Sequence, residues 1–205
     1  MSRARAEGEG KTAAGTTVGE RWQVLAERVV YEHRPWLRLV EQDVLLPSGV
    51  RIDRYILSDV PDVAMIFGIT DAGEVIFVEQ YKHGTGRASL DLCAGYIDDE
   101  DESPAAAARR ELREETGYVA DEWTDLGGFV VDPNRGPARV YYFLARGCRL
   151  AGRQELDATE DLAVRLIPLA EAAQLAASGR VSSLSTAAGI ALAIQFMRLS
   201  DQPGA

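Results

Sequence analysis

The stretch RRELREETGY (residues 109–118) places arginine and glutamate side chains close together in one short segment. Ser103 and Pro104 precede it and predict the start of a helix, because serine is a good N-cap and proline suits the first helical position. Gly117 is typical of the residue just beyond a helix end. We therefore predict a helix over about residues 104–116.

Three carboxylates of this helix form one stripe, because Glu111, Glu114 and Glu115 lie at positions i, i+3 and i+4. Their charges repel one another, and the acids of the last turn also oppose the helix dipole. A hard cation such as Mg²⁺, which prefers oxygen ligands, would remove this repulsion. A solvated helix face with Arg–Glu pairs is the other interpretation, and these three residues by themselves favour it.

The wider spacing resembles the signature of the Nudix hydrolases, the Nudix box. Seven residues lead from Glu102 to Arg110, after which the chain reads Glu-Leu-Arg-Glu-Glu-Thr-Gly. From Glu102 onward the fixed positions match except the last, where Tyr118 replaces an aliphatic residue. Upstream, six residues separate Gly95 from Glu102, whereas the signature has five. We register the box on Glu102, because Asp101 would break the spacing to Arg110.

This resemblance implies an enzyme that hydrolyses a diphosphate attached to a nucleoside and uses Mg²⁺ or Mn²⁺. The metal ligands would be the three stripe glutamates, with a further backbone contact at Ala94. In the family, a glutamate from a later acidic loop is a candidate general base, and Glu160 matches best. Glu102 and Arg110 would be hydrogen-bonded or ion-paired and would orient the metal cluster. The implied catalytic set is therefore Glu102, Arg110, Glu114, Glu115 and Glu160.

Around the box, the chain resembles the ADP-ribose pyrophosphatase branch of the family. The segment VEQYKHGTGRASLDLCAGYID (residues 78–98) is similar to the branch pattern before the box. Pro133 lies sixteen positions after Gly117, about where the branch carries a diagnostic proline. This segment departs from the branch pattern at two positions, where Asp91 replaces a glutamate and Cys93 replaces a proline.

The resemblance also implies residues that bind substrate. Trp22 and Trp36 would stack on an adenine, as aromatic residues of the leading β unit do in this branch. Both are equally well explained as strand core residues. Lys82, where the branch usually has arginine, and Arg87 precede the box and are candidates for phosphate binding, and Pro133 completes the set.

The chain divides into three predicted parts. Residues 1–20 are rich in Gly, Ala, Thr and charged residues and predict a disordered tail. Residues 21–60 are rich in β-branched residues and predict an N-terminal β unit. Residues 61–205 predict the Nudix domain, in which strands and helices follow one another. The expected class is α/β (α+β), as a Nudix α/β/α sandwich with a mixed β-sheet.

The composition, 46% hydrophobic and 26% charged residues, is that of a soluble globular protein. The formal net charge of −10 argues against nonspecific binding to nucleic acid or an anionic membrane. The cysteines, Cys93 and Cys148, show neither zinc spacing nor a disulfide framework, so we expect a reducing cytoplasm. We see no signal peptide, and the longest apolar run, residues 187–194, is too short to span a bilayer.

The main functional hypothesis is metal-dependent hydrolysis of ADP-ribose or a related nucleoside diphosphate sugar, giving a nucleoside monophosphate and a sugar phosphate. The rival is a noncatalytic Nudix module that binds such a nucleotide as a sensor, although modules of that kind usually show eroded box glutamates. The expected partner is a small-molecule nucleoside diphosphate, with no nucleic acid and no membrane. The resemblance also implies a homodimer in which the N-terminal β unit crosses between subunits.

Overall fold

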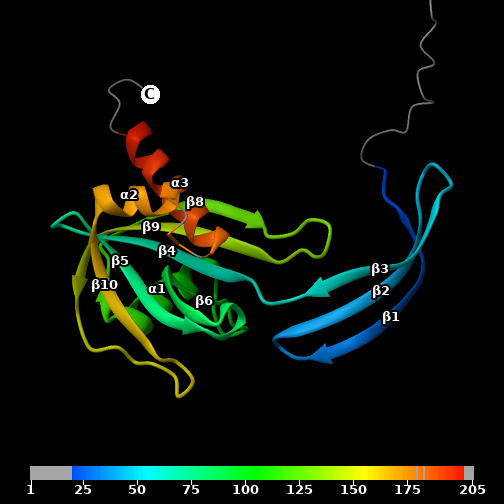
Figure 1. The fold of residues 1–205 in the computed structure, drawn as a ribbon, viewed down its shortest axis with the longest axis horizontal. Helices are drawn as coiled ribbons and strands as arrows, with labels where there is room; N and C mark the ends of the chain where they lie inside the picture. Colours follow the sequence, from blue (N-terminus) through cyan, green and yellow to red (C-terminus); the bar gives the residue numbers. More distant parts are fainter. Residues whose placement is uncertain (1–19, 179, 182, 201–205) are drawn as a thin grey trace, which may run out of the picture. The chain divides into compact units, whose positions relative to one another are not determined.

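The computed structural model describes residues 20–178, 180–181 and 183–200. Residues of the predicted tail, apart from Glu20, lie outside this described part. The chain forms two compact units, of which the first ends at Asp59 and the second begins at Val60 (Figure 1). None of the helices in the described part is long and apolar enough to cross a membrane.

The first unit is an antiparallel sheet of three strands in the order β1-β2-β3. Its strands are β1 (Gln23–His33), β2 (Leu37–Leu45) and β3 (Arg51–Asp59). The turn between β2 and β3 contains Gly49, whose φ of 82° lies in the left-handed region that glycine adopts at little cost. Every residue of β1 is exposed, so the strand presents apolar side chains that this unit does not cover by itself.

The second unit is built on a mixed sheet in the order β10-β5-β6-β4-β9-β7, with β8 paired to β9. The pairing of β4 with β9 is parallel, and the other pairings of this unit are antiparallel. Its strands are β4 (Val63–Thr70), β5 (Glu74–Lys82), β6 (Arg87–Tyr96), β7 (Tyr118–Val119), β8 (Glu122–Val130), β9 (Arg139–Leu150) and β10 (Leu162–Pro168). Its helices are a 3₁₀ turn η1 (His83–Thr85), α1 (Pro104–Thr116), α2 (Leu169–Ser178) and α3 (Leu184–Ser200).

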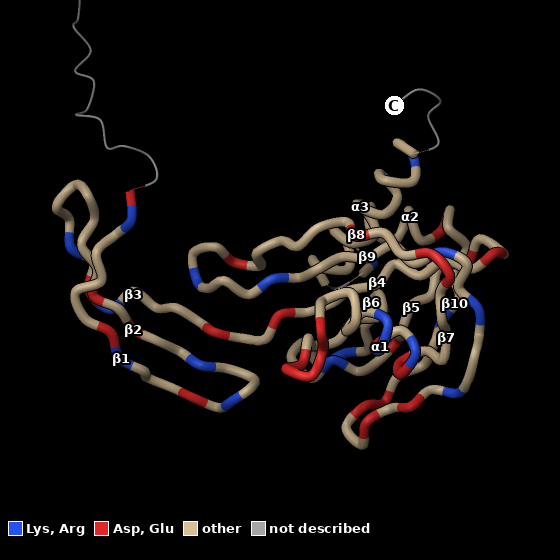
Figure 2. The backbone as a smooth tube through the Cα atoms, turned by 180° about the vertical axis from the view of Figure 1, so that it is seen from behind, with Lys and Arg blue, Asp and Glu red and all other residues tan. Residues whose placement is uncertain are grey.

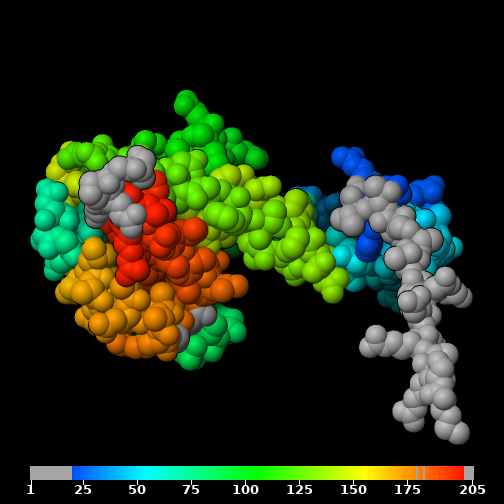
Figure 3. Space-filling view, turned by 90° about the horizontal axis from the view of Figure 1, so that it is seen from above, coloured from blue at the N-terminus to red at the C-terminus, as the bar shows by residue number. Residues whose placement is uncertain are grey.

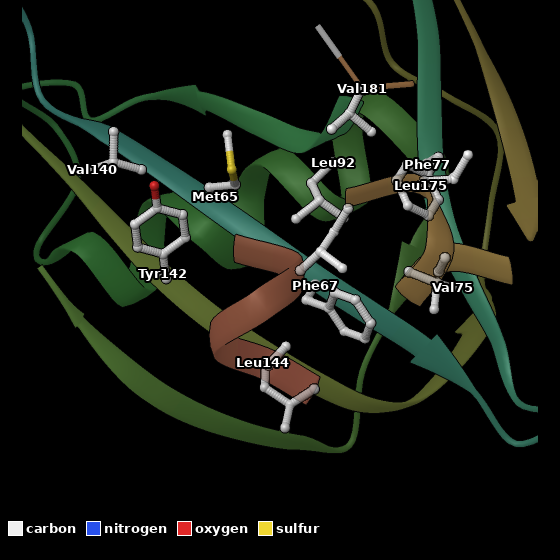
Figure 4. Close-up of a cluster of buried hydrophobic side chains, with 13 residues drawn as sticks. Met65, Phe67, Val75, Phe77, Leu92, Val140, Tyr142, Leu144, Leu175 and Val181 are labelled. Atoms are coloured by element: carbon white, nitrogen blue, oxygen red, sulfur yellow. The ribbon is translucent and has the colours of Figure 1, made fainter. Parts of the chain in front are cut away.

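Two hydrophobic clusters lie on the two faces of this sheet, because neighbouring strand residues point to opposite sides. In β4, Phe67 belongs to the cluster covered by α2 and α3, whereas Ile66 belongs to the cluster covered by α1. Figure 4 shows side chains of the first cluster, and Figure 3 shows α2 and α3 side by side at the surface of the unit. The expected α/β class with a mixed sheet between helices is therefore confirmed.

Candidate active site

Helix α1 begins and ends as its sequence predicts. The hydroxyl of Ser103 accepts a hydrogen bond from the backbone N–H of Ala106 at 3.2 Å. At the other end, Gly117 has a φ of 75° and its N–H donates to the carbonyl of Arg113 at 2.8 Å. Leu112 is fully buried against the sheet, so the orientation of the helix is set by its apolar face.

This orientation buries two of the three stripe glutamates. Glu111 is only 8% exposed and Glu115 only 4%, whereas Glu114 is half-buried. Burial raises the pKa of Glu115 to about 7, and the nearby charge of Glu111 adds to this shift. Hydrogen bonds from the thiol of Cys93 and from the backbone N–H of Ala94, the latter at 3.1 Å, oppose it and lower the pKa. A solvated face does not describe these side chains.

Glu111 lies directly against the end of β6. A Cβ atom at Gly95 would overlap the carboxyl group of Glu111, so only glycine leaves room for this arrangement. Burial raises the pKa of the Glu111 carboxyl, while the adjacent Arg110 lowers it. The close approach explains in physical terms why a glycine stands near the end of β6.

Arg110 connects these carboxylates to the preceding loop. Its Nη1 donates to Glu111 Oε1 at 2.6 Å and to Glu114 Oε2 at 3.3 Å, and its Nη2 donates to the carbonyl of Tyr96 at 3.0 Å. The same guanidinium donates to both oxygens of Asp101, from Nη2 at 2.7 Å and from Nε at 3.2 Å. This bidentate pair lowers the pKa of Asp101.

The structure therefore gives Asp101 the position beside Arg110 that the sequence analysis expected for Glu102. Glu102 is exposed, since it lies just outside the N-cap of α1, and its side chain does not contribute to the ion pairs of Arg110. The sequence did contain a signal for Asp101, because five residues separate it from Gly95, as the signature requires. The additional residue of this chain thus falls between Asp101 and Arg110.

Acidic residues gather in two loops of the second unit, residues 98–102 and 155–161 (Figure 2). The second loop brings Glu160 to the buried glutamates. After the larger effect of burial, the negative charge of Glu160 is a further cause of the raised pKa values of Glu111 and Glu115. The predicted general base therefore acts on the box carboxylates through its charge, and its carboxylate itself accepts the N–H of Asp157 at 2.9 Å.

A pocket of about 460 Å³ lies on the side of the sheet that α2 and α3 cover, since Met65 and Leu92 of its lining belong to the hydrophobic cluster on that side. It is lined by Met65, Gln80, Tyr81, Lys82, His83, Gly84, Thr85, Asp91, Leu92, Ala94, Ser183 and Thr186. Ala94 links the two features, because its backbone N–H binds Glu115 and the residue also lines the pocket. Asp91 is buried there and accepts hydrogen bonds from Ser89 at 2.6 Å and Thr186 at 2.8 Å.

Comparisons with known proteins agree with this geometry. The NUDIX domain family matches residues 60–185. This range includes the whole of α1 and all the pocket-lining residues except Thr186. The chain belongs to the NUDIX family. A second family, the nucleoside diphosphate sugar hydrolase N-terminal domain, matches residues 22–57, which form the three-stranded unit.

Several relatives of this Nudix protein are known. An ADP-ribose pyrophosphatase of Bacillus subtilis (strain 168) is 33% identical over 164 residues, which are 80% of this chain and 85% of the relative. A CMP-5'-(N-acetyl-N-hydroxy-3-aminopropyl)phosphonate hydrolase of Streptomyces rubellomurinus (strain ATCC 31215) is 30% identical over 190 residues, or 90% and 87% of the two chains. A crystal structure of an ADP compounds hydrolase has the same fold, with a TM-score of 0.77, 22% identity and coverage of 89% and 97%. This chain is therefore a Nudix hydrolase.

The Nudix carboxylates fit a hard divalent cation in their chemistry. In the described part of the chain, no three His, Cys, Asp or Glu side chains already converge as metal ligands. Glu111 and Glu115 nevertheless offer buried carboxylate oxygens, which Mg²⁺ and Mn²⁺ accept as ligands. Glu114 is turned towards Arg110 and Arg113, which donate to it at 3.3 and 2.9 Å. Its carboxylate would have to rotate away from these arginines to join the other two.

The remaining predicted substrate residues lie in different places. Lys82 lines the pocket, whereas Arg87, its partner in the β5–β6 register, is exposed outside the pocket lining. Pro133 is exposed in the loop between β8 and β9. Lys82 and Arg87 are therefore neighbours on paired strands, but of the three residues only the lysine lines the pocket.

The two tryptophans of the first unit do not meet. Trp22 precedes β1 and packs edge-on against Tyr55, with ring centroids 5.8 Å apart. Trp36 lies in the turn that joins β1 to β2, at the opposite end of this hairpin. The sequence analysis did not single out Tyr55, because only strand pairing brings β3 next to the residue that precedes β1.

Proposed function

We propose that this Nudix hydrolase is a metal-dependent pyrophosphatase that cleaves ADP-ribose or a related nucleoside diphosphate sugar to a nucleoside monophosphate and a sugar phosphate. The observation that carries the proposal is the pair of buried carboxylates, Glu111 and Glu115, of which Glu115 is bound by the backbone of Ala94, a residue that also lines a pocket of about 460 Å³. Burying two acids near one another is costly unless a cation compensates them. Such an arrangement suits a site for phosphate chemistry better than a structural helix face.

The chain's own residues account for binding and orientation. Arg110 holds Glu111 through its Nη1, and the backbone N–H of Ala94 holds Glu115, so both carboxylates keep a fixed direction. A bound divalent cation would neutralise phosphoryl charge and lower the pKa of a water molecule. Glu160, near the same carboxylates, is the proposed general base that accepts the proton of the attacking water.

Lys82 lines the pocket and supports a phosphate-bearing substrate there, because its ammonium group is positively charged. The carboxylate of Asp91 lines the same pocket. The named activities of the relatives, which are hydrolysis of ADP-ribose and of a CMP-linked phosphonate, support a nucleotide in which a phosphorus-containing bridge is cut. The named substrates of these two relatives differ in the base and in the group beyond the bridge, so the substrate panel varies both.

The test is phosphate release, coupled to a phosphatase, from a substrate panel at fixed Mg²⁺. The panel contains ADP-ribose, ADP-glucose, UDP-glucose, GDP-mannose, NADH, diadenosine polyphosphates and nucleoside triphosphates. We expect the highest kcat/KM with ADP-ribose or another nucleoside diphosphate sugar. Glu115→Gln should lower kcat by orders of magnitude while the protein stays folded. Nucleotide binding without turnover of any substrate would contradict the proposal and favour a sensor.

We also propose a homodimer. Large apolar side chains near and along β1 are exposed in the first unit, namely Trp22, Val24, Leu25, Val29, Val30 and Tyr31. Contiguous exposed apolar surface commonly marks an interaction site. Light scattering after gel filtration should give twice the mass of one chain, and a monomer mass at micromolar concentration would exclude the dimer.

The proposed cellular setting is the cytoplasm, and the proposed partners are small molecules. Cys93 and Cys148 are free and buried thiols, which suits a reducing compartment. A net charge of −10 disfavours a nucleic acid partner, because counterion release requires a basic surface. Fractionation of the native cells, with the enzyme activity as marker, tests the location.

A further inference from the structure

The C-terminal end of α1 is closed by a distant loop rather than by solvent. The last carbonyl groups of a helix have no partner inside the helix and must bind elsewhere. The carbonyl of Glu114 accepts the backbone N–H of Glu155 at 2.8 Å, and the carbonyl of Glu115 accepts the side-chain amide of Gln154 at 2.6 Å. Two of the three glutamates proposed as metal ligands, Glu114 and Glu115, therefore also hold this loop through their backbones.

The start of the same loop binds the residue that ends the helix. The carbonyl of Gly117 accepts the N–H groups of Ala151 at 2.9 Å and Gly152 at 3.2 Å. A Cβ atom at position 117 would lie 2.6 Å from the carbonyl oxygen of Gly152. Glycine at this position thus permits both the left-handed backbone and the close approach of the loop.

Side chains add two further attachments. Glu155 Oε2 accepts a hydrogen bond from Arg113 Nη1 at 2.7 Å, in an exposed ion pair. Leu156 packs against the hydrophobic cluster that α1 shares with the sheet. An exposed ion pair of this kind contributes little, so the hydrogen bonds to the carbonyls and the partly buried leucine are the main attachments.

The second half of the loop carries Glu160 in a closed turn. The N–H of Glu160 donates to the carbonyl of Asp157 at 2.9 Å, and the N–H of Asp157 donates to Glu160 Oε2 at 2.9 Å. The strand β10 follows, and its Leu162 is buried against the sheet. The turn is therefore held on one side by β10 and on the other by the attachments to α1.

We propose that Gln154 is a positioning residue for hydrolysis. Its amide fastens the loop of residues 151–161 to the carbonyl of Glu115, at the end of the helix that carries the box carboxylates, and thereby sets the place of the turn that holds Glu160. This inference rests on the proposed function, in which Glu160 accepts the proton of the attacking water. Gln154 lies outside the pocket lining and its amide binds a backbone carbonyl, so its effect is on the placement of the base.

The experiment compares Gln154→Met with Arg153→Met in the full-length protein. Methionine has nearly the length of glutamine but no N–H donor, so the first variant removes only the hydrogen bond. Arg153 is exposed in the same loop and serves as the matched control. Three quantities are measured: kcat and KM with the best substrate of the panel, the affinity for Mn²⁺ alone, and hydrogen exchange of the amides of residues 155–160 without metal.

We expect Gln154→Met to lower kcat about three- to tenfold, the range of one hydrogen bond, with KM and Mn²⁺ affinity within about twofold of wild type. The loop amides should exchange faster by a similar factor, and Arg153→Met should match the wild type. Unchanged exchange, or faster exchange with unchanged kcat, would overturn the inference. A loss of Mn²⁺ affinity equal to the loss of kcat would also overturn it, because Gln154 would then act on Glu115.

Failure of the proposed function is distinguishable from failure of this inference. A wild-type protein that turns over no substrate refutes the proposed function, and with it the positioning role. A wild-type protein that turns over substrate, with Gln154→Met equal to Arg153→Met in every measurement, refutes the positioning role alone.

Discussion

Arg110 binds both carboxylate oxygens of Asp101, at 2.7 and 3.2 Å, and uses its remaining donors for Glu111, Glu114 and the carbonyl of Tyr96. The side chain of Asp101 is only 8% exposed, so this bidentate pair is largely shielded from water. Because one guanidinium contacts both the loop and the helix, displacing Asp101 would also disturb the direction of the box carboxylates.

Asp101→Asn and Glu102→Gln form a matched pair of variants that distinguishes the two neighbouring acids. Asp101→Asn should lower kcat at least about tenfold, because a charge-assisted hydrogen bond contributes roughly 1.5–3 kcal/mol. Glu102→Gln should stay within about twofold of wild type, since its side chain is exposed. Steady-state kinetics of the two variants measure this difference. A larger loss of kcat in Glu102→Gln than in Asp101→Asn would show that Glu102 is the box residue that pairs with Arg110.

Gly95→Ala should displace Glu111, because the added methyl group would occupy the space of its carboxyl group. We expect at least about a tenfold loss of Mn²⁺ affinity and of kcat, with a smaller change in the melting temperature. Gly152→Ala is the control, because a Cβ atom at that position meets no atom within 4 Å. Isothermal titration with Mn²⁺ measures the effect, and wild-type affinity in Gly95→Ala would contradict the close approach of Glu111.

The raised pKa of Glu115 predicts a pH dependence of stability in the metal-free protein. The pKa rises from 4.5 to about 7 on folding, mainly by burial, so the native state favours the protonated acid. The free energy of unfolding should therefore fall as the pH rises from about 4.5 to about 7 and level off above. The contribution is at most roughly 3 kcal/mol, from 1.36 kcal/mol per pKa unit.

Urea unfolding in EDTA at pH 5 and pH 7.5 measures this dependence, with Glu115→Gln as the comparison. Other titrating groups are the same in both proteins, so the difference between their pH profiles isolates Glu115. We expect the wild type to lose more stability than Glu115→Gln over this interval. Parallel profiles of the two proteins would show that the acid is already ionised when buried.

Lys82→Met and Arg87→Met separate the two candidate phosphate-binding residues. Lys82 lines the pocket and Arg87 does not, so the lysine variant should raise KM about tenfold and the arginine variant about twofold or less. The kcat of both should change less than KM, because neither residue contacts the box carboxylates. An equal increase in KM for both variants would extend the binding surface beyond the pocket.

Local sequence determined α1 and its carboxylate stripe. Ser103, Pro104 and Gly117 are capping residues whose effects reach only one helical turn, and the observed helix runs between them. The stripe follows from the helical period alone, so Glu111, Glu114 and Glu115 were recognisable without any tertiary contact. The Nudix spacing, which is also local, indicated the family.

The tertiary structure decided which residues join this helix. Asp101 rather than Glu102 reaches Arg110 because the path of the chain from β6 into α1 sets which carboxylate points inward. Gln154 lies 39 positions after Glu115 in the sequence. It reaches the end of α1 because β9, which ends just before it, brings the chain back to the helix. Such contacts depend on strand pairing and on the packing of Leu156 against the cluster beneath α1, and no periodicity or cap in the sequence encodes them.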